Sequence, residues 1–206
     1  MAAEAKAERR SQAERREEAE TRLLKAAVAL VAERGLERVT LADVGEAAGY
    51  SRGLPAHYFG SKAGMIVMLA ERLVEGFGRA LVRVEHHAPG LERLIGTVRF
   101  YFDSAAKDPV GTRALHVLLG DGLSNPLVVA QLGELNARSI ASFEANITAA
   151  IDAGEARADL DARAEAVLIL AALRGAVSLW LLSPKRVDLA RVRDELAASL
   201  QRSLAA

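Results

Sequence analysis

Apolar residues that recur every three or four positions constrain this chain more than any other feature of its sequence. They begin at Leu23, Leu24, Ala27, Leu30 and Val31, and the same spacing returns in most of the segments that follow. This is the period of one face of an α-helix, whereas the strict alternation of a half-buried strand is nearly absent. Ala, Leu, Arg and Glu, which favour helices, dominate the composition. The sequence therefore predicts an all-α fold.

Glycines, prolines and capping residues divide this pattern into about nine helices. The first helix ends at Gly35, and Thr40 and Ser51 then introduce two short helices. The short helices are expected over 41–48 and 51–59, and longer ones over 61–87, 91–106, 111–119, 126–152, 161–182 and 188–204.

The sharpest change along the chain falls near residue 62, where short helices give way to long ones. Residues 1–17 are rich in Ala, Glu and Arg without an apolar stripe. Such a segment is either a solvated extension of the first helix or a mobile arm.

The composition excludes several kinds of site. The chain has 206 residues, no cysteine and four histidines. It therefore holds no disulfide, thiolate zinc site, iron–sulfur cluster or cysteine nucleophile. The histidines form no H-E-x-x-H motif, and adjacent His86 and His87 point about 100° apart on a helix, so we expect no metal and no cofactor.

The same composition argues against membrane targeting. The N-terminal segment is too charged for a signal peptide, and the longest uncharged runs, 122–133 and 175–184, are far shorter than a membrane span. We expect a soluble, cytoplasmic protein with no membrane partner.

Charge is balanced overall but not along the chain. The 27 basic and 27 acidic residues cancel, yet the 24 residues between Glu46 and Glu71 contain no acid and include Arg52 and Lys62. A stretch of this kind predicts a locally positive surface.

The second of the two short helices lies inside this stretch and follows the first without a linker. A helix over 41–48, a tight turn at Gly49 and Tyr50, and a helix over 51–59 form a helix-turn-helix arrangement, with the motif spanning about 41–60. In DNA-binding proteins the second helix of this motif enters the major groove. An ordinary helical hairpin has the same outline.

The amino-acid sequence of this segment favours a DNA-binding helix-turn-helix over an ordinary helical hairpin. The run TLADVGEAAGYSRGLPAHYFGSKAGM strongly resembles the DNA-binding domain of the TetR family of transcriptional regulators, and LLKAAVALVAERGLERVTL resembles that family's first helix. The resemblance covers about residues 18–78 closely and implies a DNA-binding domain over these residues, followed by a ligand-binding and dimerisation domain over 79–206. The C-terminal half matches in layout, notably in LRGAVSLWLLSPKRVDL, which is similar to the last two helices of many members.

The resemblance implies which residues contact DNA. Thr40 and Lys62 would bind phosphates. Arg52 would read a guanine or, alternatively, bind a phosphate, and Tyr58 belongs either to the core or to the contact surface. The full set implied by the resemblance is Thr40, Ser51, Arg52, Gly53, His57, Tyr58 and Lys62.

The recognition helix departs from the family pattern. Leu54-Pro55-Ala56 stands where the family has a Thr-Leu-Tyr run, so a hydroxyl and a phenol are missing. Pro55 lacks an amide donor and disfavours helical geometry at Leu54. The helix therefore starts late, near Leu54, or begins at Ser51 with a distorted turn; we expect the late start, with Arg52 reaching DNA from the turn.

The C-terminal half gathers most of the aromatic residues, including Phe102, in a mostly aliphatic bundle. They are either core or, as the resemblance implies, part of an effector pocket between helices. Arg174 stands out because an isolated cation on so apolar a helix must pair with an acid, extend to solvent or hold an anionic ligand. The candidate pocket residues are Phe100, Tyr101, His116, Asn136, Phe143, Arg174 and Trp180.

The last two helices each carry an apolar stripe. In the TetR family these helices pair with their twins in a four-helix dimer interface, although they could instead close the core of a single chain. The candidate interface residues are Val167, Leu170, Ala171, Gly175, Ser178, Leu189, Val192, Leu196 and Leu200.

Together these features predict a non-enzymatic, dimeric repressor that leaves a near-palindromic DNA operator when a small-molecule effector binds. One alternative is a helical ligand-binding or scaffold module that has lost DNA binding. A remote alternative is a serine hydrolase, because Gly49-Tyr50-Ser51-Arg52-Gly53 matches G-x-S-x-G.

Overall fold

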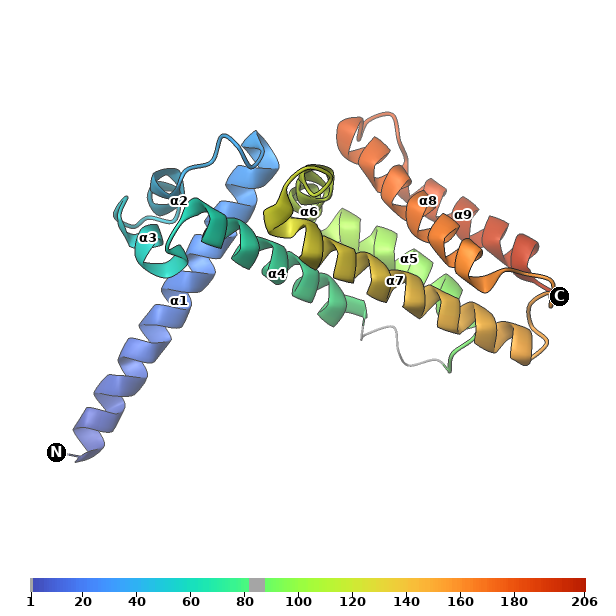
Figure 1. The fold of residues 1–206 in the computed structure, drawn as a ribbon, viewed down its shortest axis with the longest axis horizontal. Helices are drawn as coiled ribbons and strands as arrows, with labels where there is room; N and C mark the ends of the chain where they lie inside the picture. The colour runs from blue at the N-terminus through green and yellow to red at the C-terminus, as the bar shows by residue number, and fades with distance from the viewer. Residues whose placement is uncertain (1, 82–87) are drawn as a thin grey trace.

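The computed structural model describes residues 2–81 and 88–206, and within them the chain is built from α-helices and loops (Figure 1). One isolated antiparallel bridge, between Ala156 and Ala205, is the only β-type pairing in these ranges. The helices are α1 (Ala2–Arg34), α2 (Leu41–Ala47), α3 (Leu54–Phe59), α4 (Lys62–Leu81), α5 (Leu91–Lys107), α6 (Pro109–Asp121), α7 (Pro126–Asp152), α8 (Ala162–Leu182) and α9 (Leu189–Leu204). The expected all-α class is confirmed.

Helix α1 includes the charged N-terminal segment. It runs without a break from Ala2 to Arg34, and its first turns project away from the rest of the molecule (Figure 1). Of the two alternatives for residues 1–17, the structure therefore favours the helix extension for the part that it describes.

Helix α4 was expected to reach residue 87. The described part ends at Leu81, and the remainder of the expected helix, with His86 and His87, lies outside the described residues.

The helix-turn-helix segment packs against the C-terminal part of α1 and the start of α4. Fully buried Leu23, Val31, Val44, Met65 and Leu69 form the centre of this core. The same cluster takes Ala114 and Leu118 from α6 and Val128 and Leu132 from α7. The N-terminal core is therefore completed by helices that follow residue 79 in the sequence.

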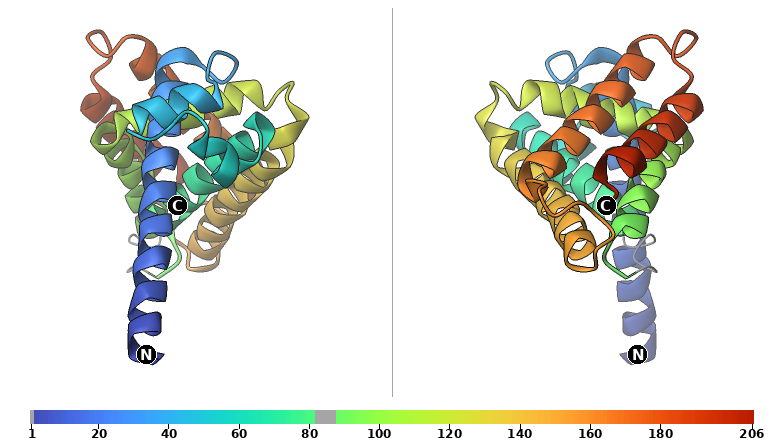
Figure 2. Two further views of the ribbon diagram at one scale, coloured as in Figure 1. Left: turned by 90° about the vertical axis from the view of Figure 1, so that its left-hand side faces the viewer. Right: turned by 90° about the vertical axis from the view of Figure 1, so that its right-hand side faces the viewer.

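Helices α5, α7, α8 and α9 form the C-terminal bundle, seen at the right of Figure 1 and end-on in Figure 2. Its centre includes Phe102, Ile147, Ile169, Leu173 and Leu204, each almost fully buried. Helix α6 lies between this bundle and α1 and contacts both α1 and α8.

Helix α3 starts late, as expected. Its first residue is Leu54, Gly53 occupies the cap position, and Pro55 lies in the first turn, where its missing amide breaks no helical bond. The Leu54 amide donates instead to the Ser51 carbonyl, at 3.1 Å. This leaves a helix of six residues and places Arg52 in the turn.

Two glycines make the tight turn possible. Gly49 has φ of +78°, a conformation that side chains with a Cβ rarely adopt. Gly45 lies where α2 and α3 approach each other most closely, because a Cβ there would come within 2.6 Å of the Ser51 carbonyl oxygen and 3.1 Å of Pro55 Cδ.

Helix α8 is apolar on both sides. Its 21 residues are long and apolar enough to cross a membrane, with a mean hydropathy of 1.8, and 33% of the most apolar window is buried inside the structure. One side belongs to the bundle core, whereas Val167, Leu168, Leu179 and Leu182 are exposed. The lengths of the uncharged runs did not predict that the whole of α8 is long and apolar enough to cross a membrane.

We predict that Gly45→Ala lowers the free energy of unfolding by about 1–3 kcal/mol, because the new methyl group must displace backbone or proline atoms. Urea denaturation followed by circular dichroism measures the change. Gly133→Ala is the matched control, since nothing lies within 4 Å of a Cβ at Gly133 in α7. It should raise stability by about 0.5–1 kcal/mol, and a Gly45 variant as stable as the parent would contradict the prediction.

Candidate DNA interface and effector region

The turn before α3 presents the predicted DNA-contacting residues to solvent. Ser51, Arg52, Gly53 and His57 are all exposed. The Arg52 side chain is 71% exposed, yet its Nε lies 3.1 Å from Oε1 of Glu46, at the end of α2. The guanidinium therefore has a carboxylate partner when no DNA is bound.

Thr40 caps helix α2. Its Oγ1 accepts a hydrogen bond from the Asp43 amide at 3.2 Å and donates one to Asp43 Oδ2 at 2.6 Å, while the Thr40 amide also donates to Oδ2, at 2.9 Å. These bonds from Thr40 hold the pKa of the Asp43 carboxyl below its ordinary value. Because the hydroxyl proton is already used, a phosphate bond from Thr40 would require the hydroxyl to turn away from Asp43.

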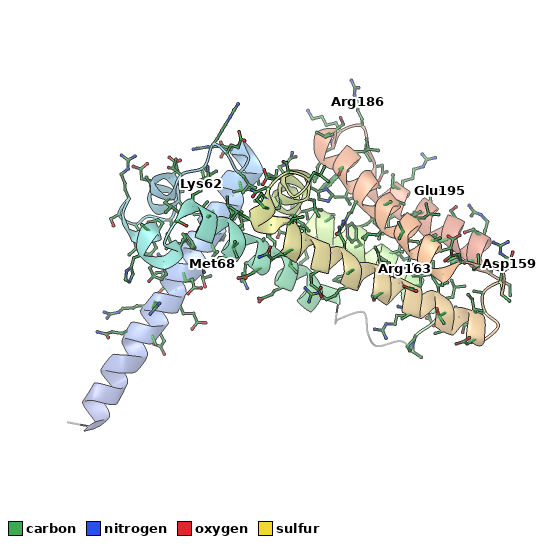
Figure 3. All side chains as sticks on the ribbon, viewed as in Figure 1. Lys62, Met68, Asp159, Arg163, Arg186 and Glu195 are labelled. Carbon is green, nitrogen blue, oxygen red and sulfur yellow. The ribbon has the colours of Figure 1, made fainter. Side chains whose placement is uncertain are left out.

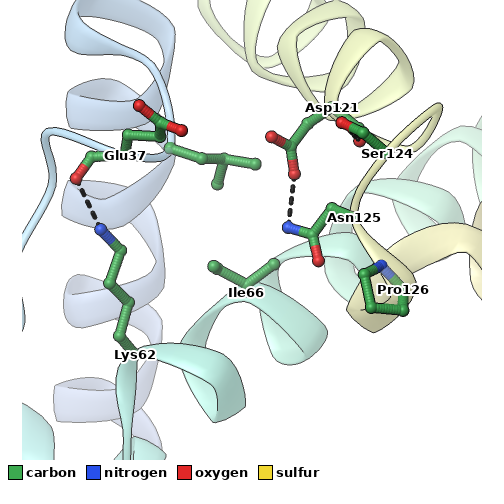
Figure 4. A pocket seen from close by; sticks show the side chains of 8 residues that line it. Glu37, Lys62, Ile66, Asp121, Ser124, Asn125 and Pro126 are labelled. Atoms are coloured by element: carbon green, nitrogen blue, oxygen red, sulfur yellow. Dashed lines mark hydrogen bonds between the residues drawn. The ribbon is translucent and has the colours of Figure 1, made fainter.

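Lys62 starts helix α4 and contacts the loop after α1. Its Nζ donates to the Glu37 carbonyl at 2.6 Å, as Figure 4 shows. The two residues line a cleft of about 380 Å³, whose other side is formed by the α6–α7 loop. An ammonium has three donors, so two remain for a phosphate.

The other residues of α3 divide between surface and core. His57 is exposed and meets the Tyr58 ring edge-to-face, with centroids 5.9 Å apart. Tyr58 is half-buried and packs against the N-terminal core, and Phe59 is fully part of it. The ring of Tyr58 is therefore at least partly a core element.

The G-x-S-x-G match lies in this turn between two helices. A nucleophile elbow requires a strand before the serine, and no strand occurs in residues 2–81 or 88–206. The structure thus removes the geometric basis of the hydrolase alternative.

Three of the seven predicted effector residues come together in the bundle. Arg174 of α8 interacts with both Tyr101 of α5 and His116 of α6, and its guanidinium donates to the Tyr101 hydroxyl. Burial lowers the pKa of Arg174, whereas the Tyr101 hydroxyl opposes that shift. The same burial raises the pKa of Tyr101.

His116 is only partly satisfied. Its Nδ1 lies 2.9 Å from Ser178 Oγ, but its Nε2 is buried and has no hydrogen-bond partner among the described residues. Burial, and then the nearby Arg174 cation, lower the pKa of His116 to about 4. The imidazole is therefore neutral at pH 7.

The other four predicted effector residues lie apart from these polar contacts, although Phe143 and Trp180 share the apolar core of the bundle with Tyr101. Phe143 is buried in the bundle core, Trp180 packs against that core, and Phe100 is half-buried. Asn136 on α7 has a buried amide oxygen without a partner in the described part of the chain.

Four of the predicted dimer-interface residues do not lie on the exposed side of the single chain. Leu170, Leu189 and Leu200 are buried in the core of the single chain, and Ser178 points inward to His116. On α8, the apolar stripe predicted from the spacing is rotated by about one position relative to the exposed apolar side of the helix. From Val167 onward, the residues of α8 that face solvent are Val167, Leu168, Ala171, Ala172, Gly175, Leu179 and Leu182, while Val192 and Leu196 of α9 are half-buried.

Two contacts were missed by reading the sequence. In the sequence, Glu46 is only the acid that precedes the acid-free stretch. A glutamate six residues before an arginine does not by itself predict the ion pair with Arg52. Arg113 of α6 donates to the Leu181 carbonyl of α8 at 2.7 Å. Neither pairing is visible without knowing how the helices turn.

We predict that His116→Gln makes stability less sensitive to acid. The folded state holds the His116 pKa near 4, below the ordinary 6.5, so the unfolded chain binds the proton more strongly. Stability from His116 is complete above pH 6.5 and is lost as the pH falls toward 4. His116 is only partly buried, so solvent reduces this effect. Between pH 7.0 and 4.5 we expect the parent to lose about 1–2 kcal/mol of its free energy of unfolding through His116, a loss that the variant does not show. Urea unfolding at pH 7.0 and 4.5 measures it; parallel losses in both proteins would contradict the prediction.

Comparison with known proteins supports the arrangement described above. The family profile described as bacterial regulatory proteins, tetR family, matches residues 23–69, and that described as BetI-type transcriptional repressor, C-terminal, matches residues 90–205. The regulator TtgR of Pseudomonas putida is 28% identical over 179 residues, covering 82% of this chain and 84% of its own. BetI of Serratia proteamaculans is 28% identical over 162 residues, covering 75% and 81%.

Among solved structures, a transcriptional regulator from Saccharomonospora viridis, crystallised with choline, shares the fold. It superposes with a TM-score of 0.83 over 92% of this chain and 99% of its own, at 21% identity. The second profile alone spans more than half of the chain. The chain therefore belongs to the TetR family of bacterial regulatory proteins, with a C-terminal region of the BetI-type repressor class.

Proposed function

We propose that two copies of this chain form a dimeric repressor that binds a near-palindromic double-stranded DNA operator in the cytoplasm and releases it when a small-molecule effector binds. The observation that carries this proposal is the exposed turn of residues 51–53 in front of the six-residue helix α3. The turn sits in a domain whose core is shared with the C-terminal bundle.

On the DNA side, Arg52 supplies base recognition from the turn, and Ser51, Gly53, His57 and Lys62 supply the surrounding contacts. A two-fold dimer places its two recognition helices about 34–36 Å apart, one turn of DNA. The ion pair with Glu46 must open before Arg52 binds a guanine, so Glu46 sets part of the free energy of binding.

The exposed apolar side of α8 provides the dimer contact. Leu168, Leu179 and Leu182 are 61%, 62% and 78% exposed in the single chain. Their neighbours Ala171, Ala172 and Gly175 are small, which lets a second helix approach closely. Burial of this side against its twin removes the apolar surface from water.

Helix α6 connects the effector region to the DNA-binding domain. Ala114 and Leu118 lie in the N-terminal core, whereas Arg113 and His116 bind α8. A ligand that moves α6 relative to α8 therefore changes the packing of α1 and the distance between recognition helices. The effect is limited by the difference in the ligand's affinity for the two arrangements.

A gel-shift assay with the DNA upstream of the chain's own gene tests this proposal. A salt-dependent shift of that DNA, stronger than the shift of unrelated DNA, supports a repressor. The absence of any shift at low salt would favour the ligand-binding or scaffold module without DNA binding.

We predict that Arg52→Ala and Lys62→Ala weaken operator binding in different ways. Arg52→Ala should cost about 1–3 kcal/mol and relax the preference at one base pair of each half-site. Lys62→Ala should weaken binding to all sequences alike and lower the salt slope by about one unit for each lysine removed. Gel shifts with single-base operator variants at several salt concentrations separate the two effects.

Glu46→Gln is the companion variant for that experiment. Removing the carboxylate frees Arg52, so operator affinity should rise while base preference stays the same. If Arg52→Ala weakened binding without any change in base preference, Arg52 would be a phosphate contact.

We predict that Leu179→Lys weakens the dimer at least about tenfold, because two charges would be buried against apolar surface. Light scattering after size-exclusion chromatography measures the monomer–dimer equilibrium. Leu123→Lys is the matched control, since Leu123 is 91% exposed in the α6–α7 loop. An unchanged equilibrium for Leu179→Lys would show that this side of α8 is not the interface.

A further inference from the structure

Arg174 is a half-buried cation on α8, and no described carboxylate interacts with it. It lies on α8 among uncharged residues, eight before it and ten after it. The described groups that interact with it electrostatically are Tyr101 and His116, and both are neutral at pH 7. A guanidinium stays protonated in proteins, so the charge is not removed by titration.

Such an arrangement is costly without a partner. A buried charge requires pairing or several hydrogen bonds, and Arg174 gains only the Tyr101 hydroxyl in the interactions described above. Of the three possibilities for a cation on this helix, pairing with an acid of the same chain is therefore not used by the described residues. Half-burial also keeps the guanidinium from extending fully into solvent.

His116 provides a second, independent indication. A neutral imidazole has one donor and one acceptor nitrogen. Ser178 satisfies Nδ1, so Nε2 remains a buried polar atom without a partner among the described residues. A ligand group that binds Nε2 would recover the cost of leaving it unsatisfied.

We propose that the effector of this chain is an apolar compound ending in an oxyanion, which binds the Arg174 guanidinium while His116 Nε2 and the Tyr101 hydroxyl complete its head-group site. This rests on the proposed function and names the chemical class of the effector. The planar fork of Arg174 suits a carboxylate or a phosphate ester, and the aliphatic and aromatic side chains of the bundle core suit an apolar tail.

The inference separates this chain from its structural neighbour. The Saccharomonospora viridis regulator was crystallised with choline, a quaternary ammonium cation. A cation beside Arg174 would be repelled, because like charges near each other in a poorly solvated site raise the free energy of both. We therefore expect this chain to reject such a ligand.

Four ten-carbon probes that differ only in the head group test the inference on the full chain: decanoate, decyl phosphate, decan-1-ol and decyltrimethylammonium, each below its micelle concentration. Trp180 is the only tryptophan, lies six positions from Arg174 on α8 and is partly buried, so its fluorescence reports binding. We expect at least one anion to bind about tenfold or more tightly than the alcohol and the cation. The tighter of the two anions identifies the head group.

Variants of two arginines on the same helix complete the test. Arg174→Met should abolish the preference for the anions, and Arg174→Lys should keep it with weaker binding. Arg163→Met is the control, since Arg163 lies at the start of α8, is 67% exposed and pairs with Glu144 (Figure 3). It should bind the probes as the parent does, and circular dichroism verifies that each variant is folded.

The inference is overturned if none of the probes binds, if decan-1-ol or decyltrimethylammonium binds as tightly as the anions, or if Arg174→Met keeps the preference. A parallel gel shift without any probe distinguishes this from a failure of the proposed function. A chain that binds decanoate through Arg174 but shifts no DNA would retain the site and lose the repressor assignment.

Discussion

Helix α6 holds the molecule together because one of its sides lies in the N-terminal core and another forms hydrogen bonds with α8. Ala114 and Leu118 are completely buried in the N-terminal cluster beside α1. Arg113 and His116, on another side of the same short helix, bind the Leu181 carbonyl and the Ser178 hydroxyl of α8. The DNA-binding segment cannot complete its own core without α6, so the two regions are not independent folding units in the usual sense. This shared packing would give a ligand in the bundle, as proposed, a physical route to the predicted DNA-contacting turn.

The predicted DNA-contacting turn depends on close backbone contact instead of side-chain packing. Gly45 leaves room for the Ser51 carbonyl and the Pro55 ring, and Gly49 supplies the positive φ that reverses the chain. Pro55 shortens α3 and moves Arg52 out of the helix. The acid-free window suggested an uninterrupted positive surface, but Glu46 reaches across the turn to Arg52. The positive charge of the predicted DNA-contacting turn is thus partly neutralised by the Arg52–Glu46 ion pair.

Helix α8 shows how one apolar helix can serve two purposes. Leu170, Leu173 and Val177 face the bundle core, whereas Leu168, Leu179 and Leu182 face solvent. Arg174 lies between these two sides, beside Tyr101. The helix is apolar enough to resemble a membrane span, yet part of that character is accounted for by core packing and the rest by the proposed twin helix.

The sequence by itself determined the helices and the kind of protein. Local signals were enough for that, because helix caps and the apolar period depend only on neighbouring residues. The caps are Thr40, Asp108, Asn125, Asp161 and Asp188. Even the late start of α3 followed from the local geometry of Pro55. The tertiary structure decided what periodicity leaves open, namely the rotation of each helix about its axis. Leu170, Leu189 and Leu200 are buried in the bundle core, and Ser178 contacts His116. Arg174 interacts with Tyr101 and His116, which lie on two other helices. These contacts join segments far apart in the chain or depend on how a helix is rotated, so no local pattern in the sequence can encode them.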